Sequence, residues 1–287
     1  MSERINVLKT YKNYVGGQFV RSESGHTYPS VTKNGKKLAQ VCRSTRKDVR
    51  DAVTAARSAQ PGWASKTAFN RGQIMYRLAE MLESQRAHFI GELTLSGMSR
   101  RQATKETDAS VDRFVYYAGW TDKYSQVFGS VNPVASPYFN FSNPEPVGVT
   151  AVFCHEKSPL LGTVTAVACT IAGGNSTIVI PSENFPLPAL SLGEVIHASD
   201  VPAGVVNILS GYHEELIDPL ASHMDVNGLL SFKSHSDVQK RLDEHASENI
   251  KRNHHKDWED GYEDSLESPY LMMEFMEIKT TWHPVGY

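Results

Sequence analysis

The sequence predicts an α/β protein built on a parallel sheet with helices on both faces. Over residues 147–246, apolar runs of strand length alternate with segments of helical periodicity, and nearly every position of those runs is apolar. Strands that are apolar throughout are typical of a sheet covered on both faces. A strict alternation of strands and helices favours parallel pairing, since each helix carries the chain back to the same edge of the sheet.

The alternating region contains four strand–helix units. We expect strands at residues 147–154, 177–180, 205–209 and 228–232, and helices at residues 159–171, 186–199, 214–222 and 236–246. The longest apolar run, residues 160–171, has the length of a core helix and is too short to span a bilayer.

The N-terminal stretch carries the signals of a hairpin and of a helix start. Gly16-Gly17 separates two short extended runs, which predicts a two-residue turn between strands. Thr45 is a capping residue with Asp48 three positions later, and apolar residues follow at helical spacing. A helix should therefore begin here and end at Pro61-Gly62.

Two further helices are predicted before the alternating region. The first covers residues 70–96 and is followed by Gly97, which is placed to end it. Its apolar stripe consists of Ile74, Leu78, Met81, Leu82, Phe89 and Leu93. The second covers residues 101–125, and its inward side chains should be Ala109, Phe114, Tyr117 and Trp120.

Three segments do not fit the alternating pattern. Residues 132–146 are rich in proline and aromatic residues, which predicts an extended arm or an edge hairpin. Residues 253–268 are polar, acidic and turn-prone, which predicts a linker. Residues 270–282 alternate with period 2 and carry apolar residues on both faces, so the predicted strand there needs a partner sheet.

Composition excludes several classes of protein. The chain has 287 residues, 40% of them hydrophobic, and a net charge of −3, which suit a globular protein without a basic nucleic-acid surface. The N-terminus lacks the apolar stretch of a secretory signal. Three cysteines at irregular spacing argue against a disulfide framework and favour a reducing compartment. We therefore expect a cytoplasmic protein that binds neither nucleic acid nor membrane.

No nucleotide-binding or hydrolase motif is complete. The chain contains no GxGxxG, no GxxxxGKS/T and no GxSxG sequence. His-Glu pairs occur at residues 155–156 and 213–214, but neither is followed by the second histidine of a zinc-protease motif.

Thiols and histidines offer little more. Cys154 and Cys169 fall in an apolar strand and an apolar helix, where cysteine is usually inert, and Cys42 lies ahead of the predicted sheet. The run of histidine and acidic residues at 254–260 is interpreted as part of a solvated linker, so no metal site is expected. Metal binding by this run remains the alternative.

The order of segments resembles the aldehyde dehydrogenase superfamily. The N-terminal half of that family is similar to YVGGQFV, RKDVRDAVTAARSAQPGW, NRGQIMYRLAEMLE and YYAGWTDKY, and its sheet region to NPEPVGVTAV, GNSTIVIPSENFPL, DVPAGVVNILSG and LASHMDVNGLLSF. The resemblance covers residues 11–252 and resumes at residues 270–286, where YLMMEFMEIKTTWHPVG is similar to the family's last strand. It implies a Rossmann-like domain and an oligomerisation arm formed by residues 132–146 and 269–287.

The resemblance also places the family's site residues, and several are substituted. Lys157 stands where the family has the asparagine that donates to the oxyanion. In the family's Lys-Pro-Ser-Glu sequence, whose Lys and Glu hold the adenosine ribose, Ile180 replaces the lysine. The turn that faces the pyrophosphate is Phe232-Lys233-Ser234-His235-Ser236 and has lost its glycine. Vestigial cofactor positions are therefore expected at Pro181, Ser182, Glu183, Gly211 and Phe232.

Beyond Arg252 the resemblance to a catalytic chain stops. The family continues with the strand that carries its catalytic glutamate and with the domain that holds its nucleophilic cysteine. Here residues 253–268 lead directly to the last strand, which implies that the catalytic domain is absent. We therefore expect no catalytic residue and no cofactor in this chain. This arrangement resembles the non-catalytic C-terminal half of family-sixteen aldehyde dehydrogenases, as do CHEKSPLLG, VIPSENFPL, NIKRNHHKDW and MEIKTTWHPVGY.

Two hypotheses for function follow from the resemblance. In the first, the chain is a pseudoenzyme in which residues 1–131 and 147–252 form a degenerate NAD-binding-like domain. Its arm would add to the sheet of a catalytic aldehyde dehydrogenase subunit or of a second copy. The expected interface residues are Tyr138, Phe139, Phe141, Tyr270, Met272, Phe275, Ile278 and Trp282. In the second, the chain is an NAD(P)-binding aldehyde oxidoreductase fragment that is active only within a complex.

Overall fold

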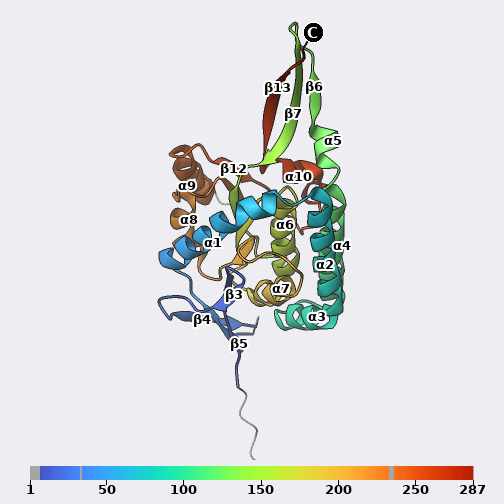
Figure 1. Ribbon diagram of the computed structural model, residues 1–287. Coiled ribbons are helices and arrows are strands. Elements are labelled where there is room, and N and C mark those ends of the chain that lie inside the picture. The colour runs from blue at the N-terminus through green and yellow to red at the C-terminus, as the bar shows by residue number, and fades with distance from the viewer. Residues whose placement is uncertain (1–6, 33, 233–235, 287) are drawn as a thin grey trace, which may run out of the picture.

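A seven-stranded sheet forms the centre of the computed structural model, which describes residues 7–32, 34–232 and 236–286 (Figure 1). The strand order is β12 (Arg252–His255), β11 (Gly228–Ser231), β8 (Val149–Phe153), β9 (Ser176–Ile180), β10 (Val206–Ile208), β2 (Asn13–Val15) and β3 (Gln18–Val20). The first five are parallel, and β2 and β3 add an antiparallel hairpin at one edge. The predicted α/β fold is confirmed, with a mixed sheet.

Helices bury both faces of this sheet. One face is covered by α6 (Pro159–Ile171) and α7 (Leu187–His197), against which pack α2 (Ala68–Ser84), α3 (Arg86–Leu95) and α4 (Arg100–Trp120). The other face is covered by α1 (Arg46–Ala64), α8 (His213–Ala221) and α9 (Ser236–Ser247). All the strands and helices predicted for residues 147–246 are present, with ends that differ by at most a few residues.

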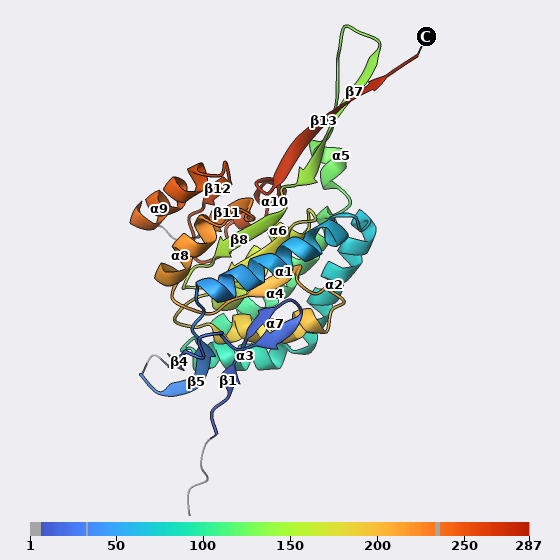
Figure 2. The ribbon, with the colours of Figure 1, turned by 60° about the vertical axis from the view of Figure 1, so that its left-hand side comes forward.

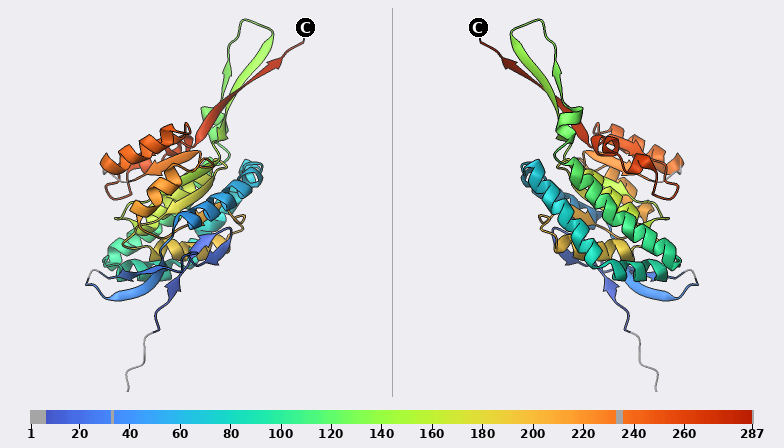
Figure 3. Two further views of the ribbon diagram at one scale, coloured as in Figure 1. Left: turned by 90° about the vertical axis from the view of Figure 1, so that its left-hand side faces the viewer. Right: turned by 90° about the vertical axis from the view of Figure 1, so that its right-hand side faces the viewer.

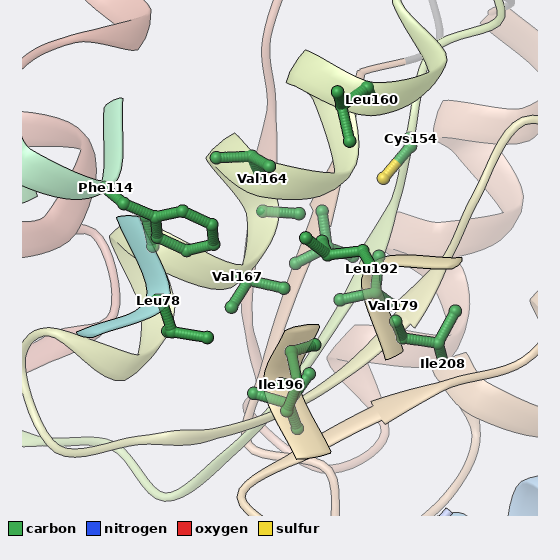
Figure 4. Packing of buried hydrophobic residues seen from close by; sticks show 14 of the residues in the cluster. Leu78, Phe114, Cys154, Leu160, Val164, Val167, Val179, Leu192, Ile196 and Ile208 are labelled. Carbon is green, nitrogen blue, oxygen red and sulfur yellow. The ribbon is translucent and has the colours of Figure 1, made fainter. Parts of the chain in front are cut away.

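Side chains of the central strands alternate between the two faces, as the strand period requires. Val152, Val179 and Ile208 belong to the core under α6 and α7, whereas their neighbours Phe153 and Ile180 belong to the core under α1 and α8. Figure 4 shows the first of these cores, in which side chains of α2, α4, α6 and α7 pack against the strands. The helix residues labelled there are Leu78, Phe114, Val164, Val167, Leu192 and Ile196.

The N-terminal hairpin is confirmed. Gly16 and Gly17 connect β2 to β3 with φ values of 58° and 77°, a left-handed conformation that glycine adopts without steric cost. A separate small sheet is formed nearby by β1 (Thr10–Tyr11), β5 (Lys37–Cys42) and β4 (Thr27–Val31), in this order.

The start of α1 is confirmed, but its predicted end is wrong. The backbone N–H of Thr45 donates to the Asp48 carboxylate at 2.7 Å, as expected for a capping pair. The helix then continues through Pro61 and Gly62 to Ala64. Its last turn is stabilised by a contact with α6, because the buried Trp63 donates its indole N–H to the carbonyl of Ile171 at 2.9 Å. Tertiary packing thus outweighs the low helix propensity of this turn.

The next two predicted helices are each shorter than expected. The helix predicted for residues 70–96 is interrupted at Gln85, where φ is −101° and ψ is 13°, so that α3 turns to pack against both α4 and α7. The helix predicted for residues 101–125 ends at Trp120, and a short α5 (Tyr124–Phe128) follows. Gly97 ends α3 as predicted, with φ of 102°.

The predicted linker begins too early. Asn253–His255 belong to β12, which pairs in parallel with β11 and forms the edge of the central sheet. Polar residues are tolerated there because an edge strand is only partly buried. Beyond it, Trp258 and Leu266, the latter in the 3₁₀ turn η1 (Asp264–Leu266), are buried, so the segment is packed against the core.

The strand predicted for residues 270–282 is also corrected. Its first part is a helix, α10 (Pro269–Met273), which Pro269 opens and the Ser268 hydroxyl caps by accepting the Tyr270 N–H at 3.2 Å. The strand itself is β13 (Met276–Pro284). It has a partner within the chain, because it pairs antiparallel with β7 (Tyr138–Pro146) along its whole length.

Strands β13 and β7 form, with β6 (Ser130–Asn132), an arm sheet that projects from the body of the molecule (Figures 2 and 3). Its strand order is β13-β7-β6, so β13 and β6 are the edges. The hairpin predicted for residues 132–146 is thereby confirmed. No helix within the described ranges combines the length and the apolar character needed to cross a membrane.

Candidate ligand site at the carboxyl edge of the sheet

The predicted site residues lie at the carboxyl ends of the parallel strands. The chain proceeds from β8 to β9 and β10 on one side and then returns to place β11 on the other side of β8, so the winding reverses between β8 and β11. In open α/β sheets, ligands bind in the crevice at such a reversal. The loops and strand ends around it carry Lys157, Pro181, Ser182, Glu183, Gly211 and Phe232.

Glu156, which follows β8, organises the loop after β9. Its carboxylate accepts the Ser182 hydroxyl at 2.5 Å, the backbone N–H groups of Glu183 and Asn184 at 3.0 and 3.1 Å, and the Asn184 amide at 3.0 Å. Burial alone would raise the pKa of Glu156, but these hydrogen bonds lower it below its ordinary value. The negative charge is therefore stably held inside the loop.

His213, the first residue of α8, joins the same group. Its backbone N–H donates to Glu183 Oε1 at 2.7 Å, and its Nε2 lies 2.7 Å from the carbonyl of Pro181. A carbonyl only accepts, so Nε2 donates to it, and Nδ1 lies 3.9 Å from Glu183 Oε1. The buried imidazole thus connects the loop after β9 to the N-terminus of α8.

The three side chains have the chemistry of a metal site. One ligand atom each from Glu156, Glu183 and His213 lies within 4.8 Å of the others. A histidine oriented by a backbone carbonyl and two carboxylates is a common ligand set for divalent cations. The same contacts also explain the cluster as a structural tie between β8, β9 and α8. The run predicted as the alternative metal site is not gathered, because His254 contacts the Glu274 carbonyl while His255 contacts Asp243.

On the other side of β8, a buried tryptophan occupies the crevice. Trp258 meets the Phe232 ring edge-on at a centroid distance of 4.8 Å and lies nearly parallel to the His155 ring at 6.3 Å. Its indole N–H is 3.4 Å from the Ser158 hydroxyl. Phe232, predicted as a cofactor position, is therefore a fully buried partner of Trp258.

The remaining predicted positions have packing roles or are solvent-exposed. Ile180 is buried in the core under α8, and Gly211 has Ser44 and Leu216 so close that a Cβ would lie 3.1–3.2 Å from them. Lys157 is exposed, with its Nζ 3.4 Å from the carbonyl of Glu259. The positions Lys233, Ser234 and His235 of the pyrophosphate turn lie outside the described residues.

All three thiols are buried. Cys42 lies at the end of β5, Cys154 directly follows β8, and Cys169 is inside α6. Burial raises the pKa of the Cys154 and Cys169 thiols well above their ordinary range, because a thiolate is poorly solvated there. None of them is placed as an accessible nucleophile.

The predicted interface residues divide into two groups. Five of them, Tyr138, Phe139, Tyr270, Ile278 and Trp282, are exposed, and Phe141 is half-buried on the arm sheet. Met272 and Phe275 were predicted wrongly, because they are fully buried in the core. The reason is that residues 269–273 form the helix α10, which turns Met272 into the core. A continuous strand would instead have placed Met272 on the arm sheet.

Three residues of this region were missed from the sequence: Glu156, His213 and Trp258. Glu156 and His213 were considered in failed zinc-protease motifs, and Trp258 in the polar linker. Glu156 and Trp258 also lie in the resembling segments CHEKSPLLG and NIKRNHHKDW, but none of the three residues was given a role. A tryptophan within an otherwise polar segment was the one available signal, since indole rings are rarely left in solvent.

The winding reversal, the helices on both faces and the residues gathered at the carboxyl edge define a Rossmann-like α/β protein. Residues 19–255 match the aldehyde dehydrogenase family model. Human retinal dehydrogenase 2 is 31% identical over 252 residues, which cover 85% of this chain and 48% of that protein. The omega-crystallin of Enteroctopus dofleini is 31% identical over 251 residues, which cover 85% of this chain and 50% of that protein.

Solved structures agree with this match. The NAD⁺ complex of aldehyde dehydrogenase from Bacillus cereus has a TM-score of 0.81 at 28% identity, covering 85% of this chain and 50% of that one. PnpE from Pseudomonas sp. WBC-3 has a TM-score of 0.82 at 28% identity, covering 87% and 51%. The chain belongs to the aldehyde dehydrogenase family, and it spans about half the length of these relatives.

Proposed function

We propose that the chain is an aldehyde dehydrogenase-like pseudoenzyme that acts as a structural or regulatory subunit. It would associate through the arm sheet with a catalytic aldehyde dehydrogenase subunit or with a second copy of itself. The observation that carries this proposal is the arm sheet itself, which projects from the body (Figure 3). Its edge strand β13 exposes the apolar side chains of Ile278 and Trp282. Such an edge is an aggregation hazard unless another sheet covers it.

The arm sheet presents apolar groups on both of its faces. On one face Trp282 contacts Tyr138 edge-on, with ring centroids 5.9 Å apart, and Ile278 lies on the same side of β13. On the other face Phe139 and Phe141, 5.6 Å apart, line a hollow of about 510 Å³ between the arm sheet and α5. Ile278 and Trp282, which lie on the same face of β13 on either side of Thr280, are 50% and 57% exposed, a large apolar area for one short strand.

A non-catalytic role is supported by the segment between β12 and α10. Residues 256–268 connect these elements directly, and Trp258 and Leu266 pack this connection onto the core, where the family resemblance expects a whole catalytic domain. The buried thiols support the same conclusion. We further propose that the chain corresponds to the non-catalytic C-terminal half of family-sixteen aldehyde dehydrogenases, and that residues 253–268, apart from the strand β12, take the place of the catalytic domain.

The residues at the carboxyl edge do not fit a dinucleotide. Ile180 lies in the core where the family has its ribose-binding lysine, and Glu183 Oε1 is already bonded to the His213 N–H. The ionised Glu156 would also repel an anionic pyrophosphate. We therefore infer that the chain works without NAD or NADP.

The second candidate function is an NAD(P)-binding subunit that supports oxidation of an aldehyde only within a complex. It is favoured by the retained Glu183 and by the fold shared with the NAD⁺ complex of the B. cereus enzyme and with PnpE in complex with nicotinamide adenine dinucleotide. Isothermal titration of the intact chain with NAD and NADP separates the two functions. Micromolar binding of either cofactor would favour the second.

The arm is tested by substitution, because removing the residues after Ser268 would also remove Met272 and Phe275 from the core. The test variant is the double substitution Ile278→Asp with Trp282→Asp. The matched control is Leu95→Asp with Met224→Asp, which places two charges at equally exposed apolar positions outside the arm sheet.

Light scattering after size exclusion then measures the assembly state of each protein. The intact chain and the control should form the same assembly, alone or after mixing with a catalytic aldehyde dehydrogenase from the same source. The arm variant should remain monomeric in both cases. An arm variant that assembles like the intact chain would overturn the proposal, as would an intact chain that stays monomeric alone and in the mixture.

A further inference from the structure

We propose that Trp258 is a built-in plug of the ligand crevice. The chain places its own indole at the winding reversal between β8 and β11, where an open α/β sheet would receive a flat ring from a bound ligand. The site is thereby closed in cis. This inference concerns the crevice and not the arm sheet, so it does not depend on the proposed mode of assembly.

The position of the ring supports the proposal. Trp258 follows β12 by three residues, yet its side chain reaches across β11 to contact Phe232, which directly follows β11, and His155, which follows β8. It is only 4% exposed, although most of the residues around it in sequence are polar. A tryptophan in a solvent-exposed loop would not be buried to this degree.

Two glycines shape the space around the indole. A Cβ at Gly162, in the first turns of α6, would lie 3.6 Å from the ring, so the helix surface under the indole carries no side chain. Gly261 has φ of 90°, and a Cβ there would lie 2.5 Å from Trp258 Cζ2. The backbone at Gly261 therefore lies too close to the indole for any side chain, and the backbone at Gly162 lies near the same ring.

Polar contacts hold the plug in place. The Ser158 hydroxyl accepts the indole N–H at 3.4 Å and donates to the Asp260 carbonyl at 2.8 Å. The Glu263 carboxylate accepts the backbone N–H groups of Asp260 and Gly261 at 3.0 and 2.9 Å. The buried Arg113 donates to the Gly261 carbonyl at 3.1 Å. These bonds tie the loop that follows Trp258 to α4 and to the start of α6.

Removing the indole should leave an apolar cavity of the same flat shape. Phe232, Leu161 and the bare surface at Gly162 would line it, with the Ser158 hydroxyl as a hydrogen-bond partner at its rim. Buried apolar cavities made by truncating a large side chain can bind a ring of the missing size. The chemical class of ligand that the open crevice accepts is thus a flat heteroaromatic ring with an N–H donor.

The experiment uses the full chain carrying Trp258→Ala, with indole as the probe and Trp258→Phe as the control. Thermal unfolding and isothermal titration are measured with and without indole, and light scattering confirms that the assembly state is unchanged. The alanine variant should unfold at a lower temperature, bind one indole per chain at least about tenfold more tightly than the wild type, and recover stability when indole is added. The phenylalanine variant should bind less indole than the alanine variant.

Two outcomes would overturn the proposal: a folded alanine variant that does not gain indole binding, or a wild-type chain that binds indole equally well. If the alanine variant does not fold, hydrogen exchange of the wild type and of Ser158→Ala decides. Slow exchange of the Asp260 and Gly261 amides in the wild type, accelerated in Ser158→Ala, supports a fixed plug. Rapid exchange in the wild type contradicts it.

Discussion

Glu106 gives the chain a stability that depends on pH. This residue of α4 is almost completely buried, and its Oε1 accepts the backbone N–H groups of Leu160 and Leu161 at 2.9 and 3.2 Å, at the start of α6. Burial raises the pKa of Glu106 from 4.5 to about 7, even though these two hydrogen bonds lower it. The folded chain therefore keeps Glu106 in its neutral, protonated form up to a higher pH than the unfolded chain does.

The sign and size of the effect follow from proton linkage. Between pH 5 and pH 8 the folded state binds more protons at Glu106 than the unfolded state does, so the free energy of unfolding falls as the pH rises. A pKa that moves from 4.5 to about 7 corresponds to a loss of roughly 2–3 kcal/mol over this range. Glu106→Gln keeps an acceptor oxygen for both N–H groups but cannot ionise, so it should lack this loss.

Urea unfolding followed by circular dichroism at pH 5, 6, 7 and 8 measures the difference directly. Glu106→Gln should be close to the wild type at pH 5 and about 2–3 kcal/mol more stable at pH 8. Glu244→Gln, an exposed substitution on α9, is the control and should follow the wild type at every pH. If the difference between Glu106→Gln and the wild type does not change with pH, Glu106 is not a buried titrating group and the reasoning is wrong.

Three other predictions follow from single contacts. A hydrogen bond to Glu92 raises the pKa of His88, so the stability that this pair contributes should be lost as the pH rises through that pKa. An NMR titration of Glu92→Gln should show a lower pKa for His88 than in the wild type. Trp63→Phe removes the indole donor to the buried carbonyl of Ile171, which still accepts the Gly174 N–H at 3.0 Å, and the lost hydrogen bond should cost about 0.5–1.5 kcal/mol in urea unfolding. Gly17→Ala forces a side chain into left-handed backbone and should lower stability by about 1–2 kcal/mol, whereas equal stability would contradict the turn geometry.

The central sheet was predictable because its signal is local and strong. Strands such as Val149–Phe153 and Ser176–Ile180 are mostly apolar and buried at every position, and the helices between them carry clear starts such as Pro159. The errors lie where a distant contact overrides a local preference. Trp63 holds the helix α1 past Pro61 through a bond to α6, and the edge position of β12 allows a polar strand that looks like a linker.

The candidate site was only half predictable for the same reason. Family resemblance led to Pro181, Ser182 and Glu183, which do lie together at the carboxyl edge. It did not lead to Glu156 and Trp258, which gain their roles from contacts with residues far away in the chain.

By itself the sequence determined the α/β class, the order of the strands along the chain, and the membership of the aldehyde dehydrogenase family. These properties depend on hydrophobic periodicity and on short motifs, which neighbouring residues express without help from the rest of the chain. The tertiary structure alone decided which side chains fill the crevice. It also decided which residues near the C-terminus belong to the hydrophobic core and which belong to the arm sheet. Burial and ring contacts depend on where the segments meet in space, and for Trp258 and Phe232 that meeting is set by how the chain after β12 packs across the sheet.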